Sequence, residues 1–257
     1  MSEREEMLER IRTALGRSKG SVPSAPSYTS EEWPPAGQRI MPRIAPEDLV
    51  ATFEAELRKV GGLPYKASAP PEIDEVIRAI VASCGATAAV LSRNPLLSRL
   101  RLADRLRACG MSAALWTAPE PPLAEHTRLE SSPQQSAVDS ASAEEAFREQ
   151  CFRAAVGITG VDFVLAESGS MVLSSLTEGS QLASLAPPVH LAFYTRPQVL
   201  ASLEEVLERL APRLNSGRSV VFVTGTSRTA DIEQILIRGV HGPREVHAVL
   251  VEESCLR

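Results

Sequence analysis

A glycine- and hydroxyl-rich segment is the first place in the sequence that could do chemistry. It follows the strongly β-forming run 219–224, and its candidate ligand-binding residues are Thr224, Gly225, Ser227, Arg228, Thr229 and Asp231. A helix is expected over residues 229–237, so free backbone N–H groups and the positive end of its dipole would face a ligand. Hydroxyls can donate to a carboxylate or phosphate, and Arg228 can pair with one through two hydrogen bonds. The segment predicts a small-anion site, although helix starts of this composition also occur without a ligand.

A carboxylate in a tight turn is the second candidate. The turn Glu167-Ser168-Gly169 separates two apolar runs, residues 161–166 and 170–175. A partly buried glutamate at a strand end is suited to acid–base or nucleophilic work. The alternative is an exposed glutamate that only forms the turn.

Histidines supply the remaining candidates. His241 lies in Gly239-Val-His-Gly-Pro243, where glycine and proline constrain the loop before the final strand. There it could orient a carboxylate or move a proton, so Glu167 and His241 are the candidate catalytic residues. His190, at the start of an apolar strand, could lie near the same crevice and contact a ligand. The four histidines are dispersed and no carboxylate cluster accompanies them, so no metal site is expected.

Composition excludes several classes of protein. The 257 residues are 44% hydrophobic and carry a net charge of −5, which does not favour nucleic acid as a partner. No apolar run approaches the roughly 20 residues that cross a bilayer, and the opening Ser2-Glu-Arg-Glu-Glu6 lacks the features of a signal peptide. The four cysteines lie far apart, without a zinc or cluster-binding motif. These features predict a cytoplasmic protein without a metal or cofactor of its own.

Helices and apolar strands alternate along most of the chain, and the positions that must hold the candidate residues follow from this pattern. Helices are expected at residues 46–60, 71–84, 95–108, 143–156, 197–210 and 229–237. Strands are expected at residues 87–91, 112–116, 161–166, 170–175, 189–194, 219–224 and 246–251. Continuous apolar strands between helices are typical of a mostly parallel sheet with helices on both faces.

Two segments fall outside this alternation. Residues 1–45 combine an amphipathic helix at 4–17 with a Pro/Ser-rich arm, so the α/β domain is expected over residues 46–257. A Pro- and Ser-rich loop is expected over residues 117–141. Capping boxes at Ser142/Glu145 and Thr195/Gln198 indicate the starts of two helices.

Several strings resemble the LUD-domain family, specifically its lactate-utilisation protein C type. They are Gly157-Ile-Thr-Gly160, Ala166-Glu-Ser-Gly-Ser170, Pro188-Val-His190, Thr224-Gly-Thr-Ser-Arg-Thr-Ala-Asp-Ile-Glu233 and Gly239-Val-His-Gly-Pro243. The last two, read together, are the most specific, and the strong part of the resemblance covers residues 150–252. It implies a Rossmann-like fold related to the NagB/RpiA/CoA-transferase group. It also implies a subunit of a complex that oxidises L-lactate to pyruvate, with iron–sulfur clusters in two sister subunits. It implies no catalytic residues for this chain.

Two other functions stay open at this point. The chain could be a stand-alone enzyme of the CoA-transferase or sugar-phosphate-isomerase kind, since the Glu167 turn resembles the catalytic glutamate turn of CoA transferases. It could also be a regulatory domain that senses an anion. In each case the hypothesis is that the 224–231 loop, Glu167 and His241 converge at the carboxyl ends of neighbouring strands and form one small-anion site.

Overall fold

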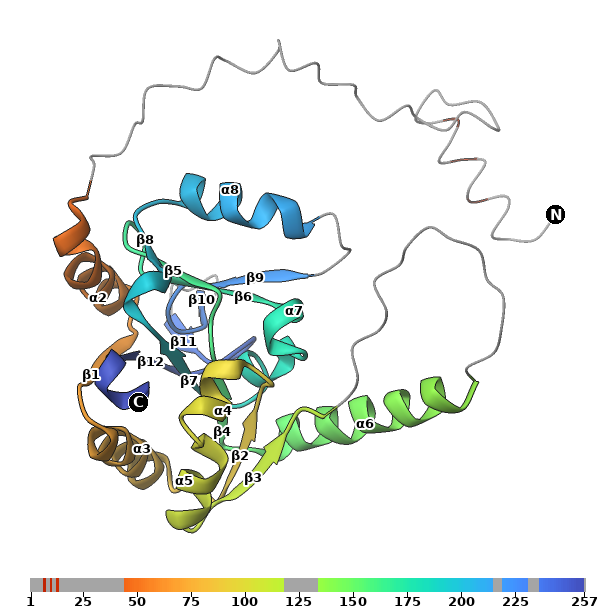
Figure 1. The fold of residues 1–257 in the computed structure, drawn as a ribbon. Helices are drawn as coiled ribbons and strands as arrows, with labels where there is room; N and C mark the ends of the chain where they lie inside the picture. The colour runs from red at the N-terminus through yellow and green to blue at the C-terminus, as the bar shows by residue number, and fades with distance from the viewer. Residues whose placement is uncertain are drawn as a thin grey trace. The chain divides into compact units, whose positions relative to one another are not determined.

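The computed structural model describes residues 44–117, 134–214, 219–230 and 236–256, with Met7, Arg10 and Thr13. All the helices and strands discussed below belong to one unit, residues 43–257 (Figure 1). The helix expected at 4–17, most of the arm after it, residues 118–133 of the expected loop and Asp231 lie outside the described residues.

Six parallel strands form the main sheet in the order β1-β12-β7-β4-β2-β3. Their bounds are Leu63–Ala67 (β1), Ala88–Leu91 (β2), Ser112–Leu115 (β3), Val156–Thr159 (β4), Val189–Tyr194 (β7) and Glu245–Val251 (β12). Strands β4 and β7 are buried at every residue, because other elements cover both faces of the sheet. The expected mostly parallel α/β fold is confirmed.

Three helices cover one face of the main sheet (Figure 1). They are α3 (Pro70–Cys84), α4 (Pro95–Arg99) and α5 (Leu102–Ala108). Ile77 and Leu106 belong to the same apolar cluster as Ile158 and Leu191 of the sheet, and all four are almost fully buried. Gly85 ends α3 in the left-handed conformation, at φ 61°, as expected for a glycine after the last helical residue.

A second sheet covers much of the other face. Its order is β8-β5-β6-β9, with bounds Phe163–Leu165 (β5), Ser170–Ser174 (β6), Val199–Leu200 (β8) and Val220–Val223 (β9). Together with α2 (Leu49–Lys59) it forms an apolar cluster against the main sheet, in which Phe53 and Tyr194 meet edge to face at 5.2 Å. Helix α8 (Leu203–Leu214) covers the outer face of the second sheet through Val206 and Leu210.

One long helix and several short elements complete the unit. Helix α6 (Gln134–Arg153) packs Phe147 and Cys151 against Val90 of the main sheet. The remaining elements are η1 (Pro46–Asp48), α7 (Ser175–Glu178), η2 (Gln181–Ser184), η3 (Arg196–Gln198), β10 (Arg228–Ala230), β11 (Leu236–Arg238) and η4 (Glu253–Leu256). No helix in the described parts of the chain is both long and apolar enough to span a membrane.

Several elements differ from the expectations, since α6 begins inside the loop expected at 117–141, the helix expected at 95–108 is divided into α4 and α5, and residues 199–200 form β8. Residues 228–230 and 236–238 pair as antiparallel strands where a helix was expected. Helix α6 begins at Gln134, before Ser142, so the Ser142/Glu145 capping box does not mark its start. The Thr195/Gln198 box is present, with Gln198 Oε1 accepting from Thr195 N at 2.8 Å, but it starts only the short η3. Strands β1 and β4 were not expected at all.

Candidate functional site

The hydroxyl-rich loop lies at the amino ends of the main strands, where it was expected at their carboxyl ends. Thr226 N donates to Val60 O at 3.3 Å, shortly before β1, and Ser227 N donates to Pro243 O at 3.0 Å, shortly before β12. Strand β9, which leads into the loop, is an edge strand of the second sheet and not a central strand of the parallel one. Arg228 then begins β10. A strand thus begins where a helix was expected, so Arg228 does not stand at a helix N-terminus.

The individual loop residues make mostly local contacts. Gly225 has φ 70°, and a Cβ there would stand 2.2 Å from Val60 O, so this position requires glycine. Arg228 is exposed, and its Nε donates to Thr226 Oγ1 at 3.3 Å. Thr229 belongs to β10.

Glu167 caps a helix. Its Oε1 accepts a hydrogen bond from Leu203 N, the first residue of α8, at 2.6 Å. The same turn reaches the hydroxyl-rich loop, because Ser170 Oγ lies 2.9 Å from Ser168 Oγ and 2.7 Å from Thr224 Oγ1. The structure thus brings the Glu167 turn and Thr224 to one end of the second sheet. The two lie beyond the carboxyl ends of β5 and β9, which run in the same direction, but these strands belong to the second sheet and not to the main parallel sheet.

The two candidate histidines lie in different surroundings. His241 is exposed in the segment that ends at Pro243, beside the hydroxyl-rich loop. His190 is fully buried in β7, with Nε2 2.8 Å from Thr159 Oγ1. Its Nδ1 has no hydrogen-bond partner among the described residues. Burial, reinforced by the nearby His247, lowers the pKa of His190 to about 3, so the ring is neutral.

Polar residues that the sequence analysis missed gather at the opposite, carboxyl edge of the main sheet. Glu178, fully buried at the end of α7, accepts hydrogen bonds from two residues that follow β2, Ser92 Oγ and Asn94 Nδ2. It also accepts one from Gly160 N, just after β4, at 3.0 Å. Burial raises the pKa of this carboxyl group, and the hydrogen bonds act against that shift. Glu178 therefore fills the space beyond β2 and β4.

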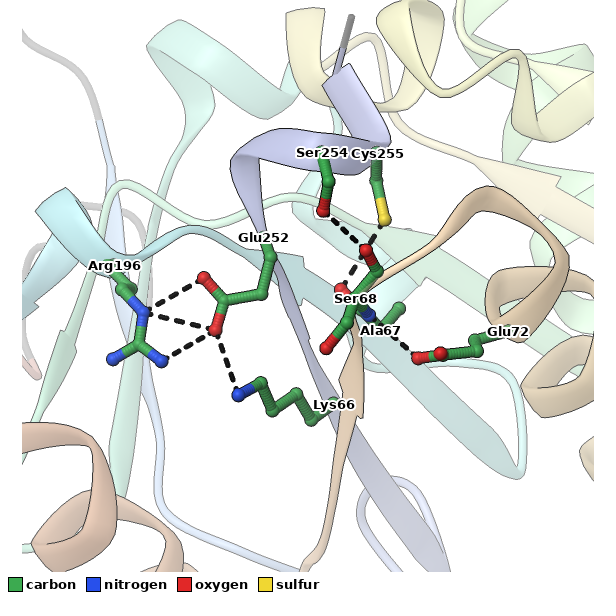
Figure 2. Close-up of polar contacts among 8 residues, drawn as sticks. All are labelled: Lys66, Ala67, Ser68, Glu72, Arg196, Glu252, Ser254 and Cys255. Carbon is green, nitrogen blue, oxygen red and sulfur yellow. Dashed lines mark hydrogen bonds and ion pairs between the residues drawn. The ribbon is translucent and has the colours of Figure 1, made fainter.

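An accessible charged cluster lies farther along the same edge, beyond β1, β7 and β12. Glu252 follows β12, and its Oε1 and Oε2 accept from Arg196 Nη2 at 2.6 Å and Nε at 2.9 Å. Lys66 Nζ lies 3.1 Å from Glu252 Oε1. Figure 2 shows both cations converging on the one carboxylate. Arg196, assisted by Lys66, holds the pKa of Glu252 below its usual range, so the carboxylate stays ionised.

Segment η4 is fixed beside this cluster by the end of β1 (Figure 2). Ser254 Oγ donates to Ser68 O, and Cys255 Sγ donates to Ala67 O at 3.4 Å. Ser68 N in turn donates to Glu72 Oε2 at 2.7 Å, which ties the same turn to α3. These hydrogen bonds therefore join the segments beside the charged cluster to one another.

A pocket of about 700 Å³ opens at this edge. It is lined by Pro95, Leu96, Arg99, Thr195, Arg196, Pro197, Gln198, Val251, Glu252, Glu253, Ser254 and Leu256. Open α/β sheets bind ligands in crevices beyond the carboxyl ends of their strands, so this pocket is the best-placed candidate site. Among the described residues no group of three His, Cys, Asp or Glu side chains could hold a metal ion.

The layered parallel sheet with a pocket at its carboxyl edge defines a Rossmann-like α/β protein. The chain belongs to the LUD-domain family, since residues 50–251 match the LUD domain. A crystal structure of a DUF162 family protein from Deinococcus radiodurans has the same fold, with a TM-score of 0.51 and 16% identity over 81% of this chain and 99% of that one.

Relatives from several genera carry the name Lactate utilization protein C, among them the following three. The protein from an Exiguobacterium species is 38% identical over 113 residues, which are 42% of this chain and 49% of that protein. The protein from Deinococcus radiodurans is 31% identical over 100 residues, 38% of this chain and 47% of that protein. The protein from Bacillus subtilis is 32% identical over 105 residues, which are 39% of this chain and 44% of that protein. The chain thus spans about half the length of the curated relatives it matches.

Proposed function

We propose that this chain acts in lactate utilisation, as a subunit of a complex that oxidises L-lactate to pyruvate and as one that holds no iron–sulfur cluster. The observation that carries the proposal is the similarity to proteins named Lactate utilization protein C in several genera. In this reaction the alcohol group of lactate becomes a carbonyl group, and the molecule loses two electrons and two protons, one proton from carbon and one from oxygen. Iron–sulfur clusters in sister subunits would accept the electrons.

The site that this role implies must hold a carboxylate, and the carboxyl edge supports it best. Arg196 and Lys66 already bind the carboxylate of Glu252 there, beside an open pocket. The loop around Arg228 offers one exposed guanidinium but lies at the amino ends of the strands. A CoA-transferase-like reaction at Glu167 has less support, because one of its carboxylate oxygens accepts the hydrogen bond that caps α8.

A gene deletion in the organism that encodes the chain tests this function. We expect the deletion strain to lose growth on L-lactate and to grow normally on pyruvate, because pyruvate enters metabolism after the proposed step. Cell extracts should lose the L-lactate-dependent reduction of an artificial electron acceptor. Expression of the intact chain should restore both. Unchanged growth on L-lactate, in a strain with no second copy of the gene, would contradict the proposal.

A further inference from the structure

The pocket at the carboxyl edge is larger than lactate requires. Its volume of about 700 Å³ lies within the range of about 300–1,000 Å³ found for sites that bury drug-sized ligands. A molecule as small as lactate would leave most of it empty. We propose that the pocket binds an organic monocarboxylate with an extended apolar body. This inference goes beyond the proposed function and does not require that lactate binds here.

The apolar part of the lining provides for the body of such a ligand. Five of the twelve lining residues are apolar, and they come from three separate segments: Pro95, Leu96, Pro197, Val251 and Leu256. Ligand pockets combine apolar walls with a few polar groups that fix orientation. Here the polar groups are concentrated in η3 and in the segment that follows β12.

The charges favour a single negative charge on the ligand. Arg99 and Arg196 line the pocket with Glu252 and Glu253, and Lys66 is bound to Glu252. Three cationic groups thus stand against two acidic ones, an excess of one positive charge. Arg196 uses Nε and Nη2 for Glu252, and Figure 2 shows its other terminal nitrogen turned away from that carboxylate. A ligand carboxylate would neutralise this excess of one positive charge, whereas a doubly charged phosphate would leave a net negative charge in the pocket.

Straight-chain monocarboxylates from acetate to octanoate are the first probes, titrated calorimetrically into the purified full chain. We expect the affinity to rise about fourfold for each CH₂ added, because each buried CH₂ contributes a constant increment to the free energy of binding. The increase should level off where the tail reaches the end of the pocket. Octylammonium should bind more weakly than octanoate. Affinities that do not change with chain length, or equal binding of the cation, would overturn the proposal.

Two substitutions that each remove one charge give the sharper test, because they should act in opposite directions. Arg196→Gln removes a cation and should weaken octanoate binding about threefold to tenfold, as expected for a half-exposed contact. Glu252→Gln removes the competing carboxylate and should strengthen octanoate binding by a similar factor. The proposal requires opposite effects in the two variants. Weaker octanoate binding in both would contradict it, because general damage to the fold would produce the same result.

The exposed ion pair Arg148–Glu145 on α6 provides matched controls. Arg148→Gln and Glu145→Gln make the same chemical changes away from the pocket and should leave octanoate binding unchanged. Leu96→Ser should reduce the gain in affinity per CH₂ without abolishing the binding of acetate. These measurements use the isolated chain, so a negative result here is distinguishable from failure of the lactate growth test.

Discussion

At the scale of single residues, burial acts in opposite directions on two titratable side chains near the main sheet. His190 and Glu178 are both fully buried. Burial lowers the pKa of the histidine and raises that of the carboxyl group, since the charged form of each is the less favourable one. Four residues donate to Glu178, whereas Thr159 is the one side chain seen bonded to the His190 ring in the described part of the chain.

His190 should make the stability of the protein depend on pH. Its pKa is 6.5 in the unfolded chain and about 3 in the folded one, so between these values the unfolded state binds more protons. The free energy of unfolding should therefore fall as the pH decreases from about 6.5 towards about 3. Well inside this window the slope from one histidine approaches about 1.4 kcal/mol per pH unit. In His190→Gln that part of the slope should be absent in urea denaturation measured from pH 7 to pH 5.

His241→Gln serves as the control, because this histidine is exposed. It should follow the parent protein across the same pH range. Glu178, whose pKa is raised, stabilises the folded state as the pH decreases, but this contribution is common to the parent and both variants. Equal pH dependence in the parent and His190→Gln would contradict the interpretation.

Some of the site residues could have been predicted from the sequence, and others could not. Arg196 and Glu252 each follow an apolar strand that was expected correctly, so a rule that collects residues just after parallel strands would have found them. The sequence analysis instead favoured glycine and hydroxyl residues, which also form ordinary loops. Glu178 could not have been found in this way, because its contacts with Ser92 and Gly160 depend on how the two sheets pack.

At the scale of elements, the strands with continuous apolar runs were the predictable ones. Strands β2, β7 and β12 lie where the sequence pattern placed them. Strand β1 was not predicted because an edge strand need not be apolar, and this one contains Pro64 and Lys66. Strand β4 was not predicted because one of its four residues is Gly157, which interrupts the apolar run. A Cβ at Gly157 would stand 1.7 Å from Ala183 O, so tertiary packing selects glycine there against strand propensity.

Two glycines at element ends provide a matched test of backbone strain against close packing. Gly85 and Gly169 have nearly equal positive φ values, 61° and 65°. A Cβ at Gly85 would meet nothing within 4 Å, whereas at Gly169 it would stand 2.3 Å from Leu57 N of α2. We expect Gly85→Ala to lower the free energy of unfolding by about 1 kcal/mol. Gly169→Ala should lower it by about 1–3 kcal/mol more, because α2 must move away from the β5–β6 turn.

Urea denaturation of both variants measures this difference directly. Because the two glycines share the unfavourable φ, the excess in Gly169→Ala reports the packing of α2 alone. Equal losses in the two variants would show that α2 is free to shift.

At the scale of the whole molecule, the two sheets share one apolar cluster. Val164, Met171 and Leu173 of the second sheet pack with Ala192 and Tyr194 of the main sheet. All five side chains are fully buried. We therefore expect both sheets to unfold in one cooperative transition.

Met171→Ala tests this expectation, since it removes a fully buried side chain from β6. The free energy of unfolding should fall by about 2–5 kcal/mol. In hydrogen exchange, the slowest amides of β7 and β12 should lose protection by the same free energy as those of β6. Loss of protection confined to the second sheet would show that the two sheets open independently.

The position of β12 has a consequence for synthesis on the ribosome. It is the last of the six main strands along the chain, yet it lies inside the sheet, between β1 and β7. Among the described residues, strand β1 pairs with β12 alone, so within that part of the chain it has no partner until residues 245–251 have been made. A nascent chain that ends before them exposes the bare edges of two strands, with a gap of one strand's width between them. Such edges pair readily with other chains, so the unfinished polypeptide should need protection by chaperones until its final strand fills the gap.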